Sequence, residues 1–251
     1  MRDIIFWEDP ASISAQYTYE YWNNEQEERK KAWFVDDESD TKLKAYLDSS
    51  GLLEEFELAI NKVGEGNIGG NILDCAAGVC WTSALLSKIA SVVNIDSLEF
   101  SKHRLEIAPK VIANLNGNEA KINRIYGSFY NIKNEASSYD LILLSQAFHH
   151  ADKPLKLLSE CDKVLKPSGK ILIIGEHVVS PFKFLKAYVK YIIKYQAIPS
   201  CSLDIFPPDE ELGDHYYTVS DYYLMFKMFG YKLLHHKSNI RNSMILVAEK
   251  M

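Results

Sequence analysis

The sequence has few cysteines, and none has the spacing used by metal sites or disulfide frameworks. The four are Cys75, Cys80, Cys161 and Cys201, with no CxxC pair and no Cys/His cluster of zinc spacing. We therefore expect buried free thiols, no bound metal and a reducing compartment.

Long apolar runs and an excess of positive charge are also lacking. The sequence contains no run of 18 apolar residues, the length needed to span a membrane. The apolar run at residues 4–7 is too short for a signal-peptide core. The net charge of −6 gives no general affinity for nucleic-acid phosphates. We expect a cytoplasmic protein without a transmembrane segment or a nucleic-acid partner.

What the chain does contain, from residue 71 onward, is a regular alternation of apolar strands and amphipathic helices. Strands are predicted at 71–75, 91–100, 121–129, 139–148 and 170–177, separated in part by helices at 81–90, 101–115 and 153–165. A last helix ends at Gly230, and two closing strands are near enough to form a hairpin. This order predicts an α/β fold with a mostly parallel sheet covered on both faces.

Two segments lie outside this alternation. Residues 1–65 predict a helical N-terminal extension, rich in aromatic side chains such as Tyr19, Tyr21 and Trp22, which we expect to act as a lid or to pack on the sheet's helical layer. The main domain then covers residues 66–251, with an insertion at about 178–216 that contains a helix over 181–195.

The loop NILDCAAGVC, residues 71–80, follows the first predicted strand, where open α/β sheets bind their ligands. A dinucleotide fold needs G-x-G-x-x-G there, and this loop keeps only Gly78. Asp74 precedes the loop, and an anion repels a pyrophosphate but suits a cationic amine. A nicotinamide cofactor is therefore disfavoured. Ala76 and Cys80 are acceptable in place of glycine if their φ angles are negative.

At Asp74, Ala76, Gly78 and Cys80 the loop resembles the first motif of the class I S-adenosylmethionine-dependent methyltransferases. The stretch from Ser137 to His177 resembles that family's fourth strand, following helix, Leu-Lys-Pro turn and fifth strand. The resemblance implies a doubly wound, seven-stranded, Rossmann-like sheet and S-adenosylmethionine as the cofactor. It covers about residues 71–177.

The resemblance also implies which residues contact the cofactor. A carboxylate at the end of the second strand holds the ribose hydroxyls, and both Asp96 and Glu99 are candidates; Glu99 fits better, with Ser101, Leu105 and Ala108 at the family's spacings. Ser128 stands where the family has an aspartate for the adenine. The implied cofactor residues are Asp74, Ala76, Gly78, Cys80, Glu99, Phe100, Ser128, Phe129, Ser145 and Gln146.

Candidates for the acceptor side follow the carboxyl ends of later strands. A hydroxyl acceptor benefits from a general base, whereas an amine that loses its proton to water needs none. The candidate catalytic residues are His177, His150 and His149, and the candidate substrate-binding residues are Glu176, His215, Tyr216 and Tyr217. For each of them a purely structural role remains an alternative.

The helix predicted at 181–195 carries Lys183, Lys186, Lys190 and Lys194 on one stripe, beside apolar residues. It could contact an anionic membrane surface or hold an acidic acceptor, or simply present a solvated lysine face.

We expect an S-adenosylmethionine-dependent methyltransferase acting on an oxygen or nitrogen of a small metabolite, sugar or lipid-linked acceptor. The alternative is a non-catalytic scaffold or regulator on the same fold, favoured by the altered positions Ala76, Cys80 and Ser128. The sequence leaves the acceptor and the oligomeric state open.

Overall fold

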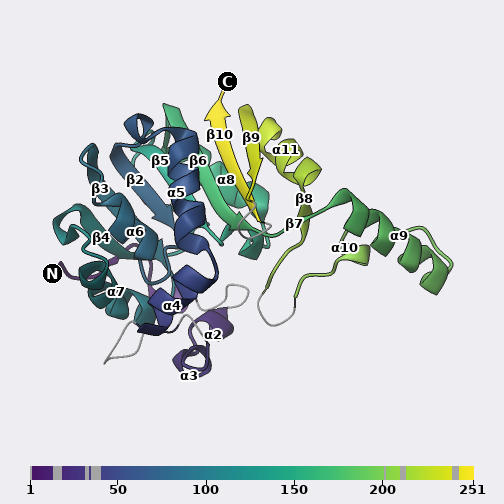
Figure 1. Cartoon of the computed structure of the whole chain (residues 1–251), viewed down its shortest axis with the longest axis horizontal. Coiled ribbons are helices and arrows are strands. Elements are labelled where there is room, and N and C mark those ends of the chain that lie inside the picture. Colours follow the sequence, from purple (N-terminus) through teal and green to yellow (C-terminus); the bar gives the residue numbers. More distant parts are fainter. Residues whose placement is uncertain are drawn as a thin grey trace.

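A computed structural model describes residues 2–13, 19–31, 34, 41–200, 202–209, 213–238 and 243–251. Its centre is a sheet with the strand order β1-β4-β3-β2-β5-β6-β10-β9 (Figure 1). The strands are β1 (Ile5–Phe6), β2 (Gly70–Cys75), β3 (Val92–Glu99), β4 (Ile122–Tyr126), β5 (Tyr139–Ser145), β6 (Leu165–Glu176), β9 (Tyr231–Lys237) and β10 (Met244–Lys250). The order reverses between β2 and β5, which places the ligand-binding switch point there.

The sheet is parallel except for the final hairpin, in which β10 runs antiparallel to both β6 and β9. The predicted seven-stranded, doubly wound sheet is confirmed. The short eighth strand β1 was not predicted: residues 1–65 were expected to be helical, but Ile5 and Phe6 pair with Ile125 and Tyr126 of β4. An exposed edge strand offers unpaired backbone groups, and β1 covers part of this edge.

Both faces of the sheet are covered, because successive strand residues point to opposite sides. Ile72 and Leu141 face α5 (Leu52–Val63), α6 (Trp81–Leu86) and α7 (Lys102–Asn114), whereas Leu73 and Ile142 face α8 (Pro154–Val164) and α11 (Val219–Met228). Within the predicted helical extension, α4 (Thr41–Ser49) and α5 are separate helices, and Gly51 between them has φ of 71°.

The turn expected at residues 166–169 is absorbed into β6 as a bulge. Leu165 already pairs with Tyr139, and regular pairing resumes at Lys170 opposite Leu141. The extra residues between these two pairs loop out of the ladder without ending the strand.

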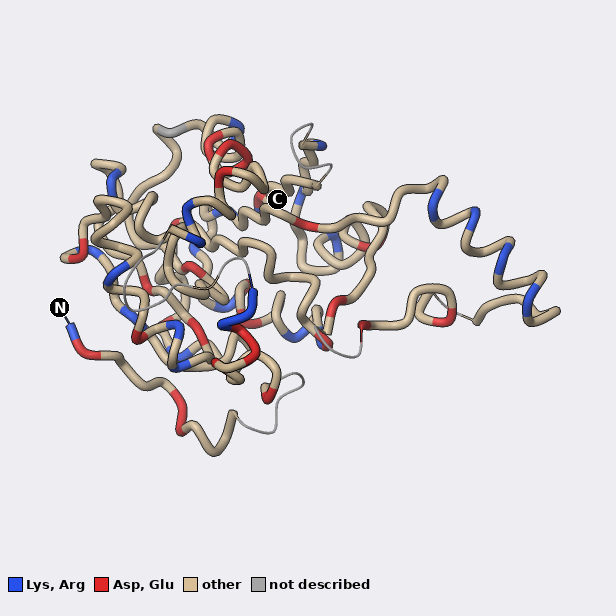
Figure 2. Tube along the Cα trace, turned by 60° about the horizontal axis from the view of Figure 1, so that its bottom comes forward, with Lys and Arg blue, Asp and Glu red and all other residues tan. Residues whose placement is uncertain are grey.

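The insertion forms an arm that leaves the body after β6 (Figure 1). It starts at β7 (Val178–Val179), contains α9 (Pro181–Tyr195) and α10 (Ser202–Ile205), and returns at β8 (Tyr217–Thr218), which pairs with β7. Figure 2 shows the lysines spaced along α9, away from the main body. None of the helices in the described part of the chain has the length and apolarity needed to cross a membrane.

Candidate active site

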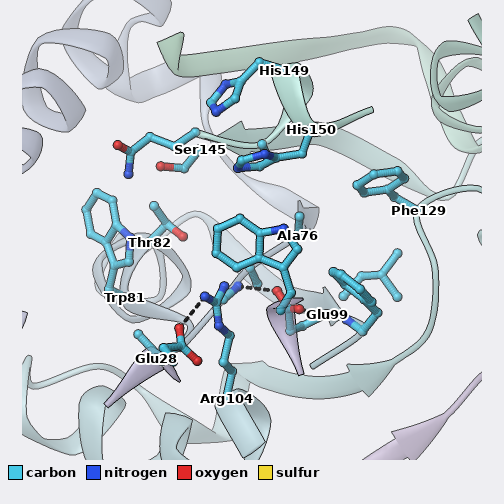
Figure 3. A pocket seen from close by; sticks show the side chains of 18 of the residues that line it. Glu28, Ala76, Trp81, Thr82, Glu99, Arg104, Phe129, Ser145, His149 and His150 are labelled. Atoms are coloured by element: carbon cyan, nitrogen blue, oxygen red, sulfur yellow. Dashed lines mark hydrogen bonds and ion pairs between the residues drawn. The ribbon is translucent and has the colours of Figure 1, made fainter. Parts of the chain in front are cut away.

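A cavity of about 240 Å³ lies at the carboxyl ends of β2, β3 and β5, far larger than the ~30 Å³ that one water occupies. The N-terminal helices α2 (Tyr19–Trp22) and α3 (Glu25–Glu28) contribute Trp22 and Glu28 to its wall. Figure 3 shows His149 and His150 at one end, with Glu99, Arg104 and Glu28 at the other. The cavity therefore has two chemically different ends.

Most of the residues predicted from the sequence line this cavity. The predicted site residues that line the cavity are Ala76, Gly78, Glu99, Phe100, Ser128, Phe129, Ser145, Gln146, His149 and His150. They come from distant parts of the chain because parallel strands bring their carboxyl ends to one edge.

The structure separates the two candidate ribose carboxylates. Glu99 lines the cavity, and its oxygens accept hydrogen bonds from the backbone N–H groups of Gly78, at 2.8 Å, and of Phe100 and Ser101, at 2.9 Å each. A carboxylate has about four acceptor positions, so room for a ligand hydroxyl remains. Asp96 lies outside the lining and accepts hydrogen bonds from Tyr139, Asn123 and Asn94.

Asp74 does not reach the cavity, contrary to the expectation that it faces a cationic amine. It is fully buried, and its Oδ2 accepts hydrogen bonds from Thr82, at 2.6 Å, and Ser83, at 2.5 Å, on α6. Burial raises its pKa to about 6, although the two hydroxyls oppose this. Asp74 thus ties the end of β2 to the helix that follows it.

The loop after β2 also differs from the expected backbone conformation. Ala76 has φ of 57° and Cys80 of 61°, in the left-handed region next to Gly78 at 55°. Both substitutes therefore adopt a conformation that costs a non-glycine residue roughly 1–2 kcal/mol. The side chain of Cys80 is fully buried and lies outside the cavity lining.

The histidine end of the cavity is built on a buried carboxylate. His149 is buried, and its Nδ1 lies 3.1 Å from Oε2 of Glu176, which also accepts a 2.6 Å hydrogen bond from Tyr222. Burial disfavours a charged His149, but Glu176 and Asp214 outweigh this and raise its pKa. Glu176 is itself fully buried, so its predicted contact with substrate is not seen. It holds His149 in place instead.

Asp214 completes this end, and it lies next to His215 in the loop predicted from the sequence to contact substrate. Its Oδ1 lies 3.0 Å from Nδ1 of His150 and 3.9 Å from Nε2 of His149. We call His149, His150 and Asp214 the histidine–aspartate cluster. No metal was expected, yet each member offers one donor atom, and the three atoms lie within 4.8 Å of one another.

The other acceptor candidates lie outside the lining. His177 is exposed, with its ring centre 5.6 Å from that of His149. His215 stacks on Tyr217, Tyr217 donates a hydrogen bond to the carbonyl of Ala151, and Tyr216 contacts Phe206. These side chains support the loop that carries Asp214.

A cover over the opposite end is held by ionic contacts that the sequence did not indicate. Glu28 of α3 pairs with both His103 and Arg104 of α7, and Arg104 lies 4.8 Å from the ring centre of Trp22. Burial alone would raise the pKa of Glu28, but His103 and Arg104 lower it to about 2. Of the other aromatic residues expected in a lid, Tyr17 and Trp33 lie outside the described residues.

The donor set fits S-adenosylmethionine. Glu99 offers a remaining acceptor position for a ligand hydroxyl, and Phe100 and Phe129 offer apolar ring surface. Ser145 carries a buried hydroxyl without a hydrogen-bond partner among the described residues, at the wall of the same cavity. A buried hydroxyl in this state favours a polar ligand.

Comparison with known proteins agrees with this fit. Residues 73–173 match the family model described as a methyltransferase domain. A demethylmenaquinone methyltransferase of Staphylococcus haemolyticus is 26% identical over 130 residues, 50% of this chain and 53% of the relative. A malonyl-[acyl-carrier protein] O-methyltransferase of Halalkalibacterium halodurans is 30% identical over 104 residues, 40% of this chain and 37% of the relative. The chain thus spans about half the length, or less, of these curated relatives.

Solved structures show the same fold. Magnesium protoporphyrin IX methyltransferase from Synechocystis, with bound S-adenosylhomocysteine, has a TM-score of 0.62 at 12% identity and covers 92% of this chain and 97% of its own. A methyltransferase from Aquifex aeolicus has a TM-score of 0.51 at 16% identity, covering 81% and 90%. Motifs, sheet order and the match over residues 73–173 agree: the chain contains an S-adenosylmethionine-dependent methyltransferase domain of the class I fold.

Proposed function

We propose that this protein transfers a methyl group from S-adenosylmethionine to a hydroxyl oxygen of a small, lipid-linked acceptor. The observation that carries the proposal is the cavity itself, with the Glu99 end suited to a nucleoside and the histidine–aspartate cluster at the other end. The cofactor supplies an electrophilic methyl carbon on a sulfonium. What the chain must supply is alignment of the acceptor oxygen with that carbon.

At the nucleoside end, Glu99 is the residue proposed to hold the ribose hydroxyls. The N–H groups of Gly78, Phe100 and Ser101 fix the position of its carboxylate. Phe100 and Phe129 would flank the adenine, and the cover formed by α2 and α3 would exclude water.

At the acceptor end, the cluster favours an oxygen over an amine. A hydroxyl must lose its proton as the methyl is transferred, and basic atoms within reach assist this. Burial lowers the pKa of His150, so this side chain is neutral near pH 7 and has a lone pair for that proton. The acceptor's O–H bond breaks, its oxygen forms the new bond to the methyl carbon, and the sulfur keeps the electron pair.

The arm supports an acceptor that resides at a lipid surface. In α9 the side chains of Phe182, Leu185, Val189 and Ile193 are 77%, 59%, 46% and 73% exposed, and no residue of α9 is buried. The stripe of four lysines runs beside them (Figure 2). Apolar groups next to basic ones suit the interface of an anionic membrane. The names of the quinone methyltransferase relatives agree with a lipophilic acceptor.

The first experiment is calorimetric titration with S-adenosylhomocysteine, using Glu99→Gln and Asp96→Asn as a matched pair. We expect Glu99→Gln to weaken binding at least 10-fold, because it removes a charged acceptor, and Asp96→Asn to bind like the wild type, because Asp96 is outside the cavity. Equal losses in both variants would contradict the site assignment.

The second experiment measures transfer of tritium-labelled methyl from S-adenosylmethionine to a lipid extract and to a pool of aqueous metabolites. We expect label in the lipid fraction, in a linkage typical of a methyl ether. Label in the aqueous fraction alone would contradict the lipid-linked acceptor. Tight cofactor binding without transfer to either pool would favour the non-catalytic scaffold.

A further inference from the structure

The histidine–aspartate cluster is unsatisfied as it stands. Nδ1 of His150 and Oδ1 of Asp214 are 3.0 Å apart, yet neither atom is in hydrogen-bond geometry with the other or with another described residue, and both are buried. Buried polar atoms are nearly always paired with protein, water or an ion. We therefore expect the cluster to bind a further group, one that interacts favourably with both an imidazole nitrogen and a carboxylate oxygen.

The charges around the cluster favour a cation as that occupant. Glu176 and Asp214 supply two carboxylates beside the imidazoles, with Oε2 of Glu176 3.1 Å from Nδ1 of His149 and Oδ1 of Asp214 3.0 Å from Nδ1 of His150. Two anionic carboxylates are thus gathered in a region largely shielded from water. A buried excess of one sign is costly unless it is paired or coordinates a metal.

The orientation of His149 is that of a metal ligand. Its Nδ1 faces Glu176, so its Nε2 is left to face Asp214 at 3.9 Å. Glu176 is fixed in turn by the Tyr222 hydroxyl and by the backbone N–H of Phe148. A carboxylate behind the distal nitrogen of a histidine is the usual support of a metal-bound imidazole.

We propose that His149, His150 and Asp214 bind one divalent transition-metal ion. Donors held about 2.1 Å from a common ion stand roughly 3.0–3.5 Å from one another, so the observed 3.0 and 3.9 Å need shifts of less than about 1 Å. Two imidazoles and one carboxylate suit Zn²⁺, Fe²⁺ or Co²⁺ and suit Mg²⁺ poorly. Because three protein ligands leave positions open, acceptor oxygens in the cavity could reach the ion.

The consequence for catalysis rests on the proposed function. An acceptor hydroxyl bound to the ion would have a lower pKa, and its proton would leave to solvent; this replaces the proton transfer to His150 that applies without the ion, because the ion then occupies that nitrogen's lone pair. The ion would also fix the oxygen in line with the methyl carbon. Metal binding itself needs neither acceptor nor methyl transfer, so it can be measured separately.

The test is calorimetric titration of chelator-treated protein with Zn²⁺ and with Mg²⁺, and an absorption titration with Co²⁺. We expect one Zn²⁺ per chain with micromolar or tighter affinity, no measurable Mg²⁺ binding, and Co²⁺ bands typical of low coordination number. His150→Ala and Asp214→Ala should weaken Zn²⁺ binding at least 10-fold, and Glu176→Gln by 10- to 100-fold. His235→Ala, which removes an exposed imidazole of β9, should bind Zn²⁺ like the wild type.

Circular dichroism and S-adenosylhomocysteine binding verify that each variant is folded. Should a variant not fold, Mn²⁺ broadening of imidazole resonances in the wild type replaces it, with His149 and His150 broadened and His235 unaffected. Absence of Zn²⁺ binding to the wild type, or equal binding to the wild type and both ligand variants, would overturn the proposal. Metal binding without methyl transfer would contradict the proposed function and leave the metal site intact.

Discussion

Single residues in the first loop carry strain that glycine would avoid. Ala76 has φ of 57° in a position where the family resemblance implies glycine. Left-handed backbone costs a residue with a Cβ roughly 1–2 kcal/mol, partly offset because glycine loses more chain entropy on folding, about 0.5–1 kcal/mol. The non-glycine residues thus lower stability without removing any backbone N–H group from the loop.

We predict that Ala76→Gly raises the free energy of unfolding by about 0.5–1 kcal/mol, measured by urea denaturation. The neighbouring Ala77→Gly is the matched control: Ala77 is buried and does not have a positive φ, so its replacement should be destabilising. An Ala76→Gly variant less stable than the wild type would show that the left-handed conformation carries no such cost.

The raised pKa of the single residue Asp74 leads us to predict that the stability of the protein depends on pH. Its pKa is raised to about 6 in the folded protein, from 3.8, so the folded state binds this proton more tightly than the unfolded state. The contribution of Asp74 to stability is therefore largest below pH 3.8 and falls as the pH rises to 6. About two pKa units correspond to about 3 kcal/mol.

The measurement is urea denaturation of the wild type and Asp74→Asn, without ligand, from pH 4 to pH 7. Relative to the wild type, the variant should gain on the order of 3 kcal/mol over this range, because asparagine does not ionise. Comparing the two proteins cancels the titration of the other groups. A stability difference that is the same at both pH values would contradict the raised pKa of the buried Asp74.

At the scale of elements, the contact between α3 and α7 decides how the cavity is covered. Glu28 binds His103 and Arg104, and its pKa of about 2 means that the contact persists at neutral pH. Its contribution to stability is present above pH 4.5 and is lost as the pH falls towards 2. Trp22 lies on the cavity wall in the same segment, so the cover and the cofactor end are coupled.

We predict that Glu28→Gln speeds dissociation of S-adenosylhomocysteine several-fold, because the cover then opens more often. Stopped-flow fluorescence measures this rate. Glu25→Gln is the control, since Glu25 pairs with Arg29 on the exposed side of the same short helix. A dissociation rate equal in the two variants would mean that α3 does not act as a lid.

At the scale of the whole molecule, the arm and the sheet differ in how deeply their side chains are buried. The sheet core contains side chains such as Leu143 and Ile173 with no exposed surface, whereas α9 has no buried residue. Truncating a core leucine to alanine costs about 2–5 kcal/mol, but a substitution on an exposed helix face usually changes stability by less than 0.5 kcal/mol. The side chains of α9 are therefore available to contact a membrane surface without a loss of core packing.

We predict that replacing Lys183, Lys186, Lys190 and Lys194 together by glutamate abolishes co-sedimentation with anionic vesicles while leaving the melting temperature nearly unchanged. Each lysine near such a surface contributes about 1 kcal/mol of attraction, and glutamate reverses its sign. Neutral phosphatidylcholine vesicles are the control. Equal sedimentation of the variant and the wild type would contradict membrane contact through α9.

The sequence by itself determined the order of the main strands and helices, the methyltransferase motifs and ten of the residues that line the cavity. Apolar runs and glycine positions act locally, and parallel strands necessarily bring the segments after residues 75, 99 and 145 to one edge. The spacing of Ser101, Leu105 and Ala108 was also enough to favour Glu99 over Asp96, because these residues lie within one short stretch of sequence.

Only the tertiary structure decided the electrostatic environment of the side chains. Burial against α6 turned Asp74 away from the cavity, and burial behind His149 made Glu176 a support. The return of the arm at β8 brought Asp214 to His150, far away in the sequence. Such contacts depend on how distant segments pack in three dimensions, which no local pattern encodes.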